Sequence, residues 1–273
     1  QVYRHMDIGS AKITPEEMQG VTHYMIDELE PDEEFHVVRF VTMAKEYLKE
    51  IYADGKIPII AGGTGFYIQA LLYDIDFTEQ QCDETYRRQL EDLAREHGAE
   101  YLHGILREVD PASAEAIHAN NIKRVIRALE FYHLSGKKIS EHNKTERQKQ
   151  SPYNFAYFVL TDERAKLYER IDRRVNAMIE AGLVEEVKKL KSMGCSREMV
   201  SMQGLGYKEI LDYLDGITTL PEAVEILKRD TRHFAKRQLT WFRHMEGICW
   251  LDASAPDVRE QAARLTNEFL AKG

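Results

Sequence analysis

KIPIIAGGTGFYIQALL, residues 56–72, is the stretch that decides the fold. Its apolar run, residues 56–61, predicts a short buried strand, and residues 66–72 predict a helix. The glycine-rich turn Gly62–Gly65 separates the two. A strand, a tight turn and a helix in this order are typical of a parallel α/β sheet, in which ligands lie beyond the carboxyl end of a strand.

The sequence on both sides extends this pattern. Before residue 56, a capping box at 14–17 predicts a short helix, 23–27 a strand and 35–52 a helix. Between residues 80 and 148 only charged helical segments occur, at 83–97, 111–118 and 121–134. After that, strands are predicted at 155–161 and 248–252, with helices at 164–181, 182–193, 205–214 and 221–245 between them. We therefore predict an α/β fold, a parallel sheet core flanked by helices with an all-helical insertion domain. The division is core 1–78, insertion 79–150, and core 151–273 with C-terminal helices.

Composition restricts the class of protein. The 273 residues carry a formal net charge of −9, which argues against binding nucleic acid over the whole surface but permits a local basic patch. The three cysteines, Cys82, Cys195 and Cys249, form no C-x-x-C pair, which suits a reducing cytoplasm. There is no run of 18 apolar residues and no signal-peptide layout, so we expect no membrane association. Because Gln1 opens directly on an apolar-containing segment, we also expect the natural chain to continue upstream.

Two features suit an anionic ligand. The turn Gly62–Gly65 places backbone N–H groups and the Thr64 hydroxyl at a helix N-terminus, although a plain strand-to-helix turn has the same sequence. Arg170 and Arg174 are four residues apart on a predicted helix, and arginine matches diphosphate oxygens bidentately. A solvated helix face balanced by acidic neighbours explains these arginines equally well.

Two basic segments suit RNA. Residues 228–243, KRDTRHFAKRQLTWFR, interleave six Lys or Arg with aromatic residues against one Asp, which favours phosphate contact over an ordinary solvated face. Arg229, Arg232, Lys236 and Arg243 fall on one helical stripe, and Ala235, Leu239 and Phe242 can face a core. Residues 120–130, NNIKRVIRALE, carry a second basic cluster, for which a surface helix is an equally good interpretation.

Several chemistries have no motif in the chain. There is no G-x-S-x-G, H-E-x-x-H or G-x-G-x-x-G sequence, and we predict no protein metal site. His23 and Asp27 lie four apart on an expected strand, and we assign them structural roles. Hydrolase, metalloprotease and dehydrogenase functions are therefore not supported.

Seven blocks in order resemble the bacterial tRNA dimethylallyltransferases. They are QVYRHMDIGSAK at 1–12, HYMID at 23–27, IPIIAGGTGFYIQALL at 57–72, NNIKRVIRALE at 120–130, RIDRRVNAMIEAGLVEEV at 170–187, QGLGYKEI at 203–210 and TRHFAKRQLTWFR at 231–243. The resemblance covers nearly the whole chain. It departs from the family at Ser10, where Thr is usual.

The resemblance implies an activity. In this family the core is similar to that of P-loop NTPases, the helical insertion grips the tRNA anticodon stem-loop, and Mg²⁺ assists at the diphosphate of dimethylallyl diphosphate. The prenyl group is transferred to N6 of adenosine 37 in the anticodon loop. The family's phosphate loop and an Asp expected as general base belong upstream of Gln1. We expect a cytoplasmic monomer.

The resemblance also implies site residues. Thr64 and Arg174 are the expected catalytic residues, and Arg174 with Arg170 is expected to hold the diphosphate. The expected tRNA-binding residues are Gln1, Thr64, Arg87, Lys123, Arg124, Arg127, Gln203, Gly206, Tyr207, Lys208, Lys236, Arg237, Gln238, Thr240, Trp241 and Arg243. Three other functions remain open, because fold alone does not fix function: a P-loop small-molecule kinase using ATP, an RNA-binding module without catalysis, and a transferase acting on free adenine nucleotides.

Overall fold

The computed structural model describes residues 1–77 and 83–272. The chain divides into two compact units, which are described separately. Unit 1 comprises residues 1–68 and 154–273, and unit 2 comprises residues 69–153. The predicted boundary at 78 and 79 and the residue Cys82 lie outside the described residues.

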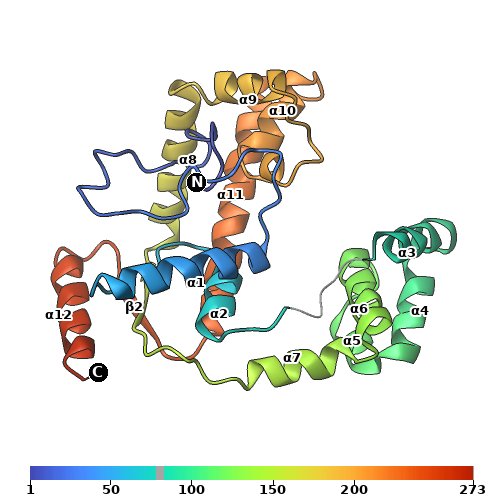
Figure 1. Ribbon diagram of the computed structural model, residues 1–273. Helices are drawn as coiled ribbons and strands as arrows, with labels where there is room; N and C mark the ends of the chain where they lie inside the picture. Colours follow the sequence, from blue (N-terminus) through green and yellow to red (C-terminus); the bar gives the residue numbers. More distant parts are fainter. Residues whose placement is uncertain (78–82, 273) are drawn as a thin grey trace. The chain divides into compact units, whose positions relative to one another are not determined.

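Unit 1 consists of helices and one small sheet (Figure 1). Its elements are α1 (Val37–Ala53), α2 (Gly65–Leu72, which continues into unit 2), β1 (Tyr157–Thr161), α8 (Arg164–Glu180), α9 (Leu183–Ser192), the 3₁₀ turn η1 (Ser201–Gln203), α10 (Tyr207–Leu214), α11 (Leu220–Arg243), β2 (Ile248–Asp252) and α12 (Val258–Leu270). Strands β1 and β2 pair in parallel, with Tyr157 opposite Ile248 and Thr161 opposite Asp252. The prediction of a parallel sheet with helices between these two strands is confirmed.

The core of unit 1 lies where helices α8 to α11 pack together and receive the N-terminal segment. Leu183, Val187 and Leu190 of α9 are fully buried at i, i+4 and i+7, as one face of an amphipathic helix requires. Val2 and Met6 come from the irregular first residues and are buried in the same cluster. Apolar burial therefore holds this segment against the helices, because it has almost no secondary structure of its own.

Unit 2 contains only helices among its described residues (Figure 1). They are α3 (Glu84–His97), α4 (Ala99–Val109), α5 (Pro111–Ala116), α6 (Ile122–Ser135) and α7 (Ile139–Arg147). Leu102, Leu106, Val125 and Leu129 are almost completely buried and form its own core between α4 and α6. Helices α4 and α7, like α12 in unit 1, were not among the predicted segments.

Three local predictions are wrong. The capping box at 14–17 forms, with reciprocal hydrogen bonds between Thr14 and Glu17 of 2.9 and 3.3 Å, but only a turn follows. Gln19 and Gly20 take positive φ angles that end the turn at once. The expected strand at 23–27 is irregular, because Met25 and Asp27 also have positive φ angles (61° and 55°).

The expected strand at 56–61 is not formed, and these residues have no regular secondary structure. No described strand pairs with it, and Ile59 is 88% exposed. A strand is stabilised by its neighbours' hydrogen bonds and by burial, and this run has neither within residues 1–77 and 83–272. The glycine turn and α2 that follow form as predicted.

Candidate active site and RNA-binding surfaces

The glycine turn packs against the end of α11. Thr64 precedes α2 and its carbonyl accepts hydrogen bonds from the N–H groups of Tyr67 (2.9 Å) and Ile68 (3.2 Å). The Gln238 side chain of α11 donates from Nε2 to the Gly63 carbonyl at 2.9 Å. Two segments that were predicted separately, the Thr64 turn and residues 236–243, therefore meet in unit 1.

The close approach of α11 limits which side chains fit at positions 63 and 65. A Cβ at position 65 would lie 2.3 Å from Cδ1 of Trp241, and a Cβ at position 63 would lie 2.1 Å from Nε2 of Gln238. Both distances are shorter than van der Waals contact allows, and the indole ring in particular cannot bend away. Gly65 is thus needed for packing against the Trp241 ring, whereas the flexible Gln238 side chain could move away from a side chain at position 63. Thr64, between them, is exposed at the surface.

Helix α11 presents cations and aromatic rings together near its end. Lys236, Arg237 and Arg243 are exposed, and the Arg237 guanidinium lies 5.7 Å from the centroid of the Phe234 ring. Trp241 is 39% exposed and stands edge-on to Phe66 at 6.1 Å between ring centroids. Such a mixture of exposed cations and rings suits phosphates and unstacked bases.

The predicted cationic stripe of α11 is divided in two. Arg229 pairs with Asp230 at 2.9 Å and Arg232 pairs with Asp172 of α8 at 2.5 Å. Lys236 and Arg243, further along, have no ion-pair partner among the described residues. The first half of the stripe is therefore taken up by ion pairs, one within α11 and one to α8, and the second half is available to a ligand.

Helix α8 carries the two arginines expected at the diphosphate. Arg170 pairs with Asp162 at 3.1 Å, and the Asp162 side chain is only 5% exposed. Arg174 lies one turn further on, is exposed, and has no ion-pair partner in the described parts of the chain. Because α11 contacts α8 through Arg232 and the Thr64 turn through Gln238, one helix links both parts of the predicted site.

The side chain of Gln1 is anchored. Its Nε2 donates to the Ala11 carbonyl at 2.8 Å, and its own backbone carbonyl accepts from the Asp27 N–H at 3.1 Å. The neighbouring Lys12 ammonium is almost fully buried and donates to the Tyr3 carbonyl (2.8 Å) and to the carboxylates of Asp7 (2.6 Å) and Asp27. Gln1 thus belongs to a fixed part of unit 1.

The QGLGYKEI segment contributes exposed and buried residues. Gln203 is exposed and donates to the Arg197 carbonyl. The Lys208 ammonium lies 3.4 Å from the buried Glu209 carboxylate. Gly206 is buried with φ of 95°, and Tyr207 is only 3% exposed. The Tyr207 side chain therefore cannot contact RNA directly in this structure.

Unit 2 gathers four cations on α3 and α6. The Arg87 guanidinium binds the Glu130 carboxylate bidentately, with Nε and Nη2 at 2.9 and 2.8 Å from its oxygens. Burial lowers the pKa of Arg127, and the charge of Arg87 adds to that effect, so these two arginines are neighbours. Lys123 and Arg124 are exposed on the first turn of α6 and form no ion pair within the described residues.

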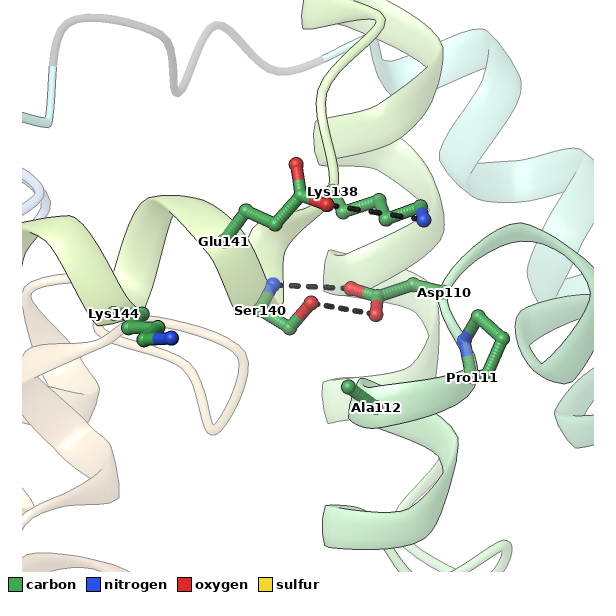
Figure 2. A pocket seen from close by; sticks show the side chains of 7 residues that line it. All are labelled: Asp110, Pro111, Ala112, Lys138, Ser140, Glu141 and Lys144. Atoms are coloured by element: carbon green, nitrogen blue, oxygen red, sulfur yellow. Dashed lines mark hydrogen bonds and ion pairs between the residues drawn. The ribbon is translucent and has the colours of Figure 1, made fainter.

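A cavity of about 330 Å³ lies elsewhere in unit 2 (Figure 2). Its lining residues are Asp110, Pro111, Ala112, Lys138, Ser140, Glu141 and Lys144, and none of them is a predicted site residue. Asp110 is buried and accepts hydrogen bonds from the backbone N–H and hydroxyl of both Ser113 and Ser140. The carboxylate therefore caps α5 and α7 at the same time, which is a structural role.

Two features are absent from the described residues, a cluster of metal-binding side chains and a membrane-crossing helix. Among them, no three His, Cys, Asp or Glu side chains come together in a way that would hold a metal ion. In the same residues, no helix combines the length and the apolar character needed to cross a bilayer.

The model of the family described as IPP transferase matches residues 1–245. The chain therefore belongs to the IPP transferase family, whose members are transferases. It is 61% identical over 266 residues to a protein of Lachnoclostridium phytofermentans named tRNA dimethylallyltransferase, covering 97% of this chain and 84% of the relative. It is 51% identical over 271 residues to a protein of Acetivibrio thermocellus with the same name, covering 99% and 87%.

Solved structures agree with this assignment. The full-length tRNA isopentenylpyrophosphate transferase of Bacillus halodurans matches with a TM-score of 0.72 and 44% identity, covering 100% of this chain and 86% of that one. A eukaryotic dimethylallyltransferase, whose structures are described as snapshots of the enzyme acting on tRNA, matches with a TM-score of 0.85 and 28% identity, covering 100% and 71%. The predicted resemblance to this family of transferases is confirmed.

Proposed function

We propose that the enzyme transfers the dimethylallyl group of dimethylallyl diphosphate to N6 of adenosine 37 in the tRNA anticodon loop and releases diphosphate. One observation carries the proposal beyond family membership. The Thr64 turn, expected at the target base, packs directly on the basic and aromatic end of α11, which is expected to hold RNA. A base at Thr64 and the RNA that flanks it would then be held by one continuous surface.

Arg174 is the residue proposed to stabilise the leaving group. Diphosphate gains negative charge as the allylic C–O bond breaks, and fixed cations stabilise that charge in the transition state. Arg174 is exposed and has no ion-pair partner in the described parts of the chain, so it can turn to a ligand at little cost. Arg170, already paired with Asp162, is proposed to bind the diphosphate from one turn away.

The target amine needs a general base, and the adenine that carries it must leave the stacked bases of the loop. The lone pair of the adenine amine is delocalised into the ring, so its proton has to be taken as the new C–N bond forms, which contributes roughly 10²–10⁴-fold. We propose an Asp upstream of Gln1 as this base, with Thr64 and Gln1 beside the adenine. The adenine is extruded from the loop to reach them, and water is kept from the allylic carbon.

Both units are proposed to bind the anticodon stem-loop. In unit 2, which we propose as the tRNA-binding insertion, the cations are Arg87, Lys123, Arg124 and Arg127. In unit 1 the proposed contacts are Gln1, Thr64, Gln203, Lys208, Lys236, Arg237, Gln238, Thr240, Trp241 and Arg243. Gly206 and Tyr207 are buried and are proposed to act by shaping this surface.

The fold of the core, the oligomeric state, the location and the cofactor complete the proposal. We propose that unit 1 is a P-loop NTPase-like core and that the enzyme works as a cytoplasmic monomer. Mg²⁺ is the proposed cofactor. Mg²⁺ usually takes one or two carboxylates together with substrate phosphates, so when bound it would add to the charge that Arg170 and Arg174 supply to the diphosphate.

An assay with two labelled donors tests the function. Full-length enzyme is incubated with unmodified tRNA and either labelled dimethylallyl diphosphate or γ-labelled ATP. We expect label in tRNA only from the prenyl donor, and nucleoside analysis should locate it on adenosine 37. Label passing from ATP to a small molecule would favour the kinase alternative. Transfer to free adenosine monophosphate as fast as to tRNA would contradict the RNA substrate.

A further inference from the structure

A carboxylate of α9 holds a turn of the N-terminal segment by its backbone. Oε2 of Glu186 accepts from the N–H groups of Asp7 (2.9 Å) and Ile8 (2.7 Å), and Oε1 accepts from that of Gly9 (3.0 Å). Successive backbone N–H groups that converge on one anion form a nest, and hydrogen bonds to a charged acceptor are stronger than neutral ones. Residues far apart in sequence are thus joined by three short bonds.

Tyr207 completes this arrangement from α10. Its hydroxyl donates to Oε1 of Glu186 at 2.9 Å, and its ring fills the space that a side chain at position 9 would need. A Cβ on Gly9 would lie 2.6 Å from Cζ of Tyr207. Burial raises the pKa of the Tyr207 hydroxyl, and the charge of Glu186 raises it further, so the group stays a neutral donor at physiological pH.

The turn held in this way leads to the proposed site. The segment Asp7–Lys12 is closed by a bond of 2.8 Å from the Lys12 N–H to the Asp7 carbonyl. The carbonyl of Ala11, within the same turn, accepts the side-chain N–H of Gln1 at 2.8 Å. A displacement of the turn would therefore move the group that orients Gln1.

We propose that Glu186 and Tyr207 are positioning residues, which fix the turn Asp7–Lys12 and through it Gln1. The inference rests on the proposed function, in which Gln1 lies beside the target adenine. It gives Tyr207 a role that its burial permits, in place of direct contact with RNA.

Kinetics of conservative variants test the proposal. Tyr207→Phe removes one O–H and Glu186→Gln removes the charge while keeping the shape. We expect each to lower kcat about 10-fold while the tRNA Kd stays within about twofold, because small misplacements of reacting groups are costly to turnover. The double variant should be no worse than the more impaired single variant, since both act on one turn. Tyr213→Phe, on the same helix, is the matched control and should behave as the wild type.

Hydrogen exchange gives a readout that does not need activity. In the unliganded full-length protein, Glu186→Gln should accelerate amide exchange at residues 7–9 by at least about tenfold, with smaller changes in α11. Unchanged exchange there would overturn the proposal, and so would faster exchange with unchanged kcat. A raised tRNA Kd in Tyr207→Phe with normal kcat would restore direct RNA contact instead. If the wild-type enzyme transfers no prenyl group, the proposed function fails. The exchange result still decides whether Glu186 fixes the turn Asp7–Lys12.

Discussion

The buried carboxylates of unit 2 and the exposed cations of unit 1 differ in their partners. In unit 2 the buried carboxylates are satisfied from within: Asp110 by Ser113 and Ser140, and Glu146 by the Asp76 N–H at 2.8 Å and by Lys149 at 2.7 Å. In unit 1, Arg174, Lys236 and Arg243 stand exposed without an ion-pair partner in the described residues. The difference indicates that the interior of unit 2 serves stability, and that the open cations of unit 1 serve a ligand.

The largest expected effect belongs to Arg174. Arg174→Ala should lower kcat about 10²–10³-fold, since loss of one preorganised charge-stabilising donor has effects of this size. The Kd for tRNA should stay the same, because the group meets the diphosphate. Single-turnover prenyl transfer and tRNA titration measure the two quantities separately.

Arg173→Ala is the matched control for this change. Arg173 is the adjacent residue, equally exposed, and its weak ion pair with Glu169 at 3.9 Å contributes little. We expect its kcat to stay near that of the wild type. Equal losses in the two variants, or a weaker tRNA complex with Arg174→Ala, would mean that α8 is an RNA surface.

The next largest effect should be on the stability of unit 2. Asp110→Ala removes a carboxylate that accepts four hydrogen bonds. Two serine hydroxyls and two backbone N–H groups then lose their acceptor. We expect a loss of about 2–4 kcal/mol in the free energy of unfolding, measured by urea denaturation. Glu141→Ala, at an exposed residue of the same cavity, should change it by less than about 0.5 kcal/mol.

The pH dependence of unfolding sharpens this prediction. Burial pushes the pKa of Asp110 upward, but the hydrogen bonds from Ser113 and Ser140 outweigh it, and the net pKa lies below its ordinary value of 3.8. The carboxylate therefore stabilises the fold above pH 3.8 and loses this effect as the pH falls through its lower folded pKa. Asp110→Ala should lack this part of the acid sensitivity. An identical acid profile in both proteins would contradict the assignment.

Helices with a local signal could be predicted, and those with distant partners could not. The α6 pattern of apolar residues is visible in sequence, as is the Thr219 and Pro221 start of α11. Helix α7 was missed because its N-cap, Lys138, gives no capping hydrogen bond and the Asp110 carboxylate that caps it comes from elsewhere. Helix α12 was given no range although its apolar residues Val258, Ala262, Leu265 and Phe269 recur at helical spacing.

The site was predictable to the extent that residue types reveal chemistry. The glycine turn and the basic segment at 228–243 were both identified, but their contact through Gln238 is nonlocal and no pattern indicates it. The division of the α11 stripe depends on Asp172, one helix away. Glu186 was missed altogether, because a lone glutamate on an amphipathic helix gives no sign that it binds backbone N–H groups at positions 7–9.

A smaller effect, on affinity, is expected at the end of α11. Lys236→Ala with Arg243→Ala should raise the Kd for tRNA about tenfold and reduce the slope of log Kd against log salt by about 1.5, because each cation releases close to one counterion. The kcat at saturating tRNA should stay near the wild-type value. Arg264→Ala, an exposed arginine of α12 paired with Glu268, controls for the loss of charge alone. A salt slope that stays at the wild-type value would remove α11 from the RNA surface.

The smallest effect should come from Lys123 and Arg124 of unit 2. Both are exposed on the first turn of α6, where the helix dipole is also positive, so their replacement by Ala should leave the fold intact and raise the Kd for tRNA about three- to tenfold. The effect should add to that of the α11 pair, since residues in separate surfaces contribute independently. Filter binding at several salt concentrations measures it. If the combined variant binds no worse than the α11 pair alone, unit 2 does not contact tRNA through α6, and its well-satisfied interior would serve stability only.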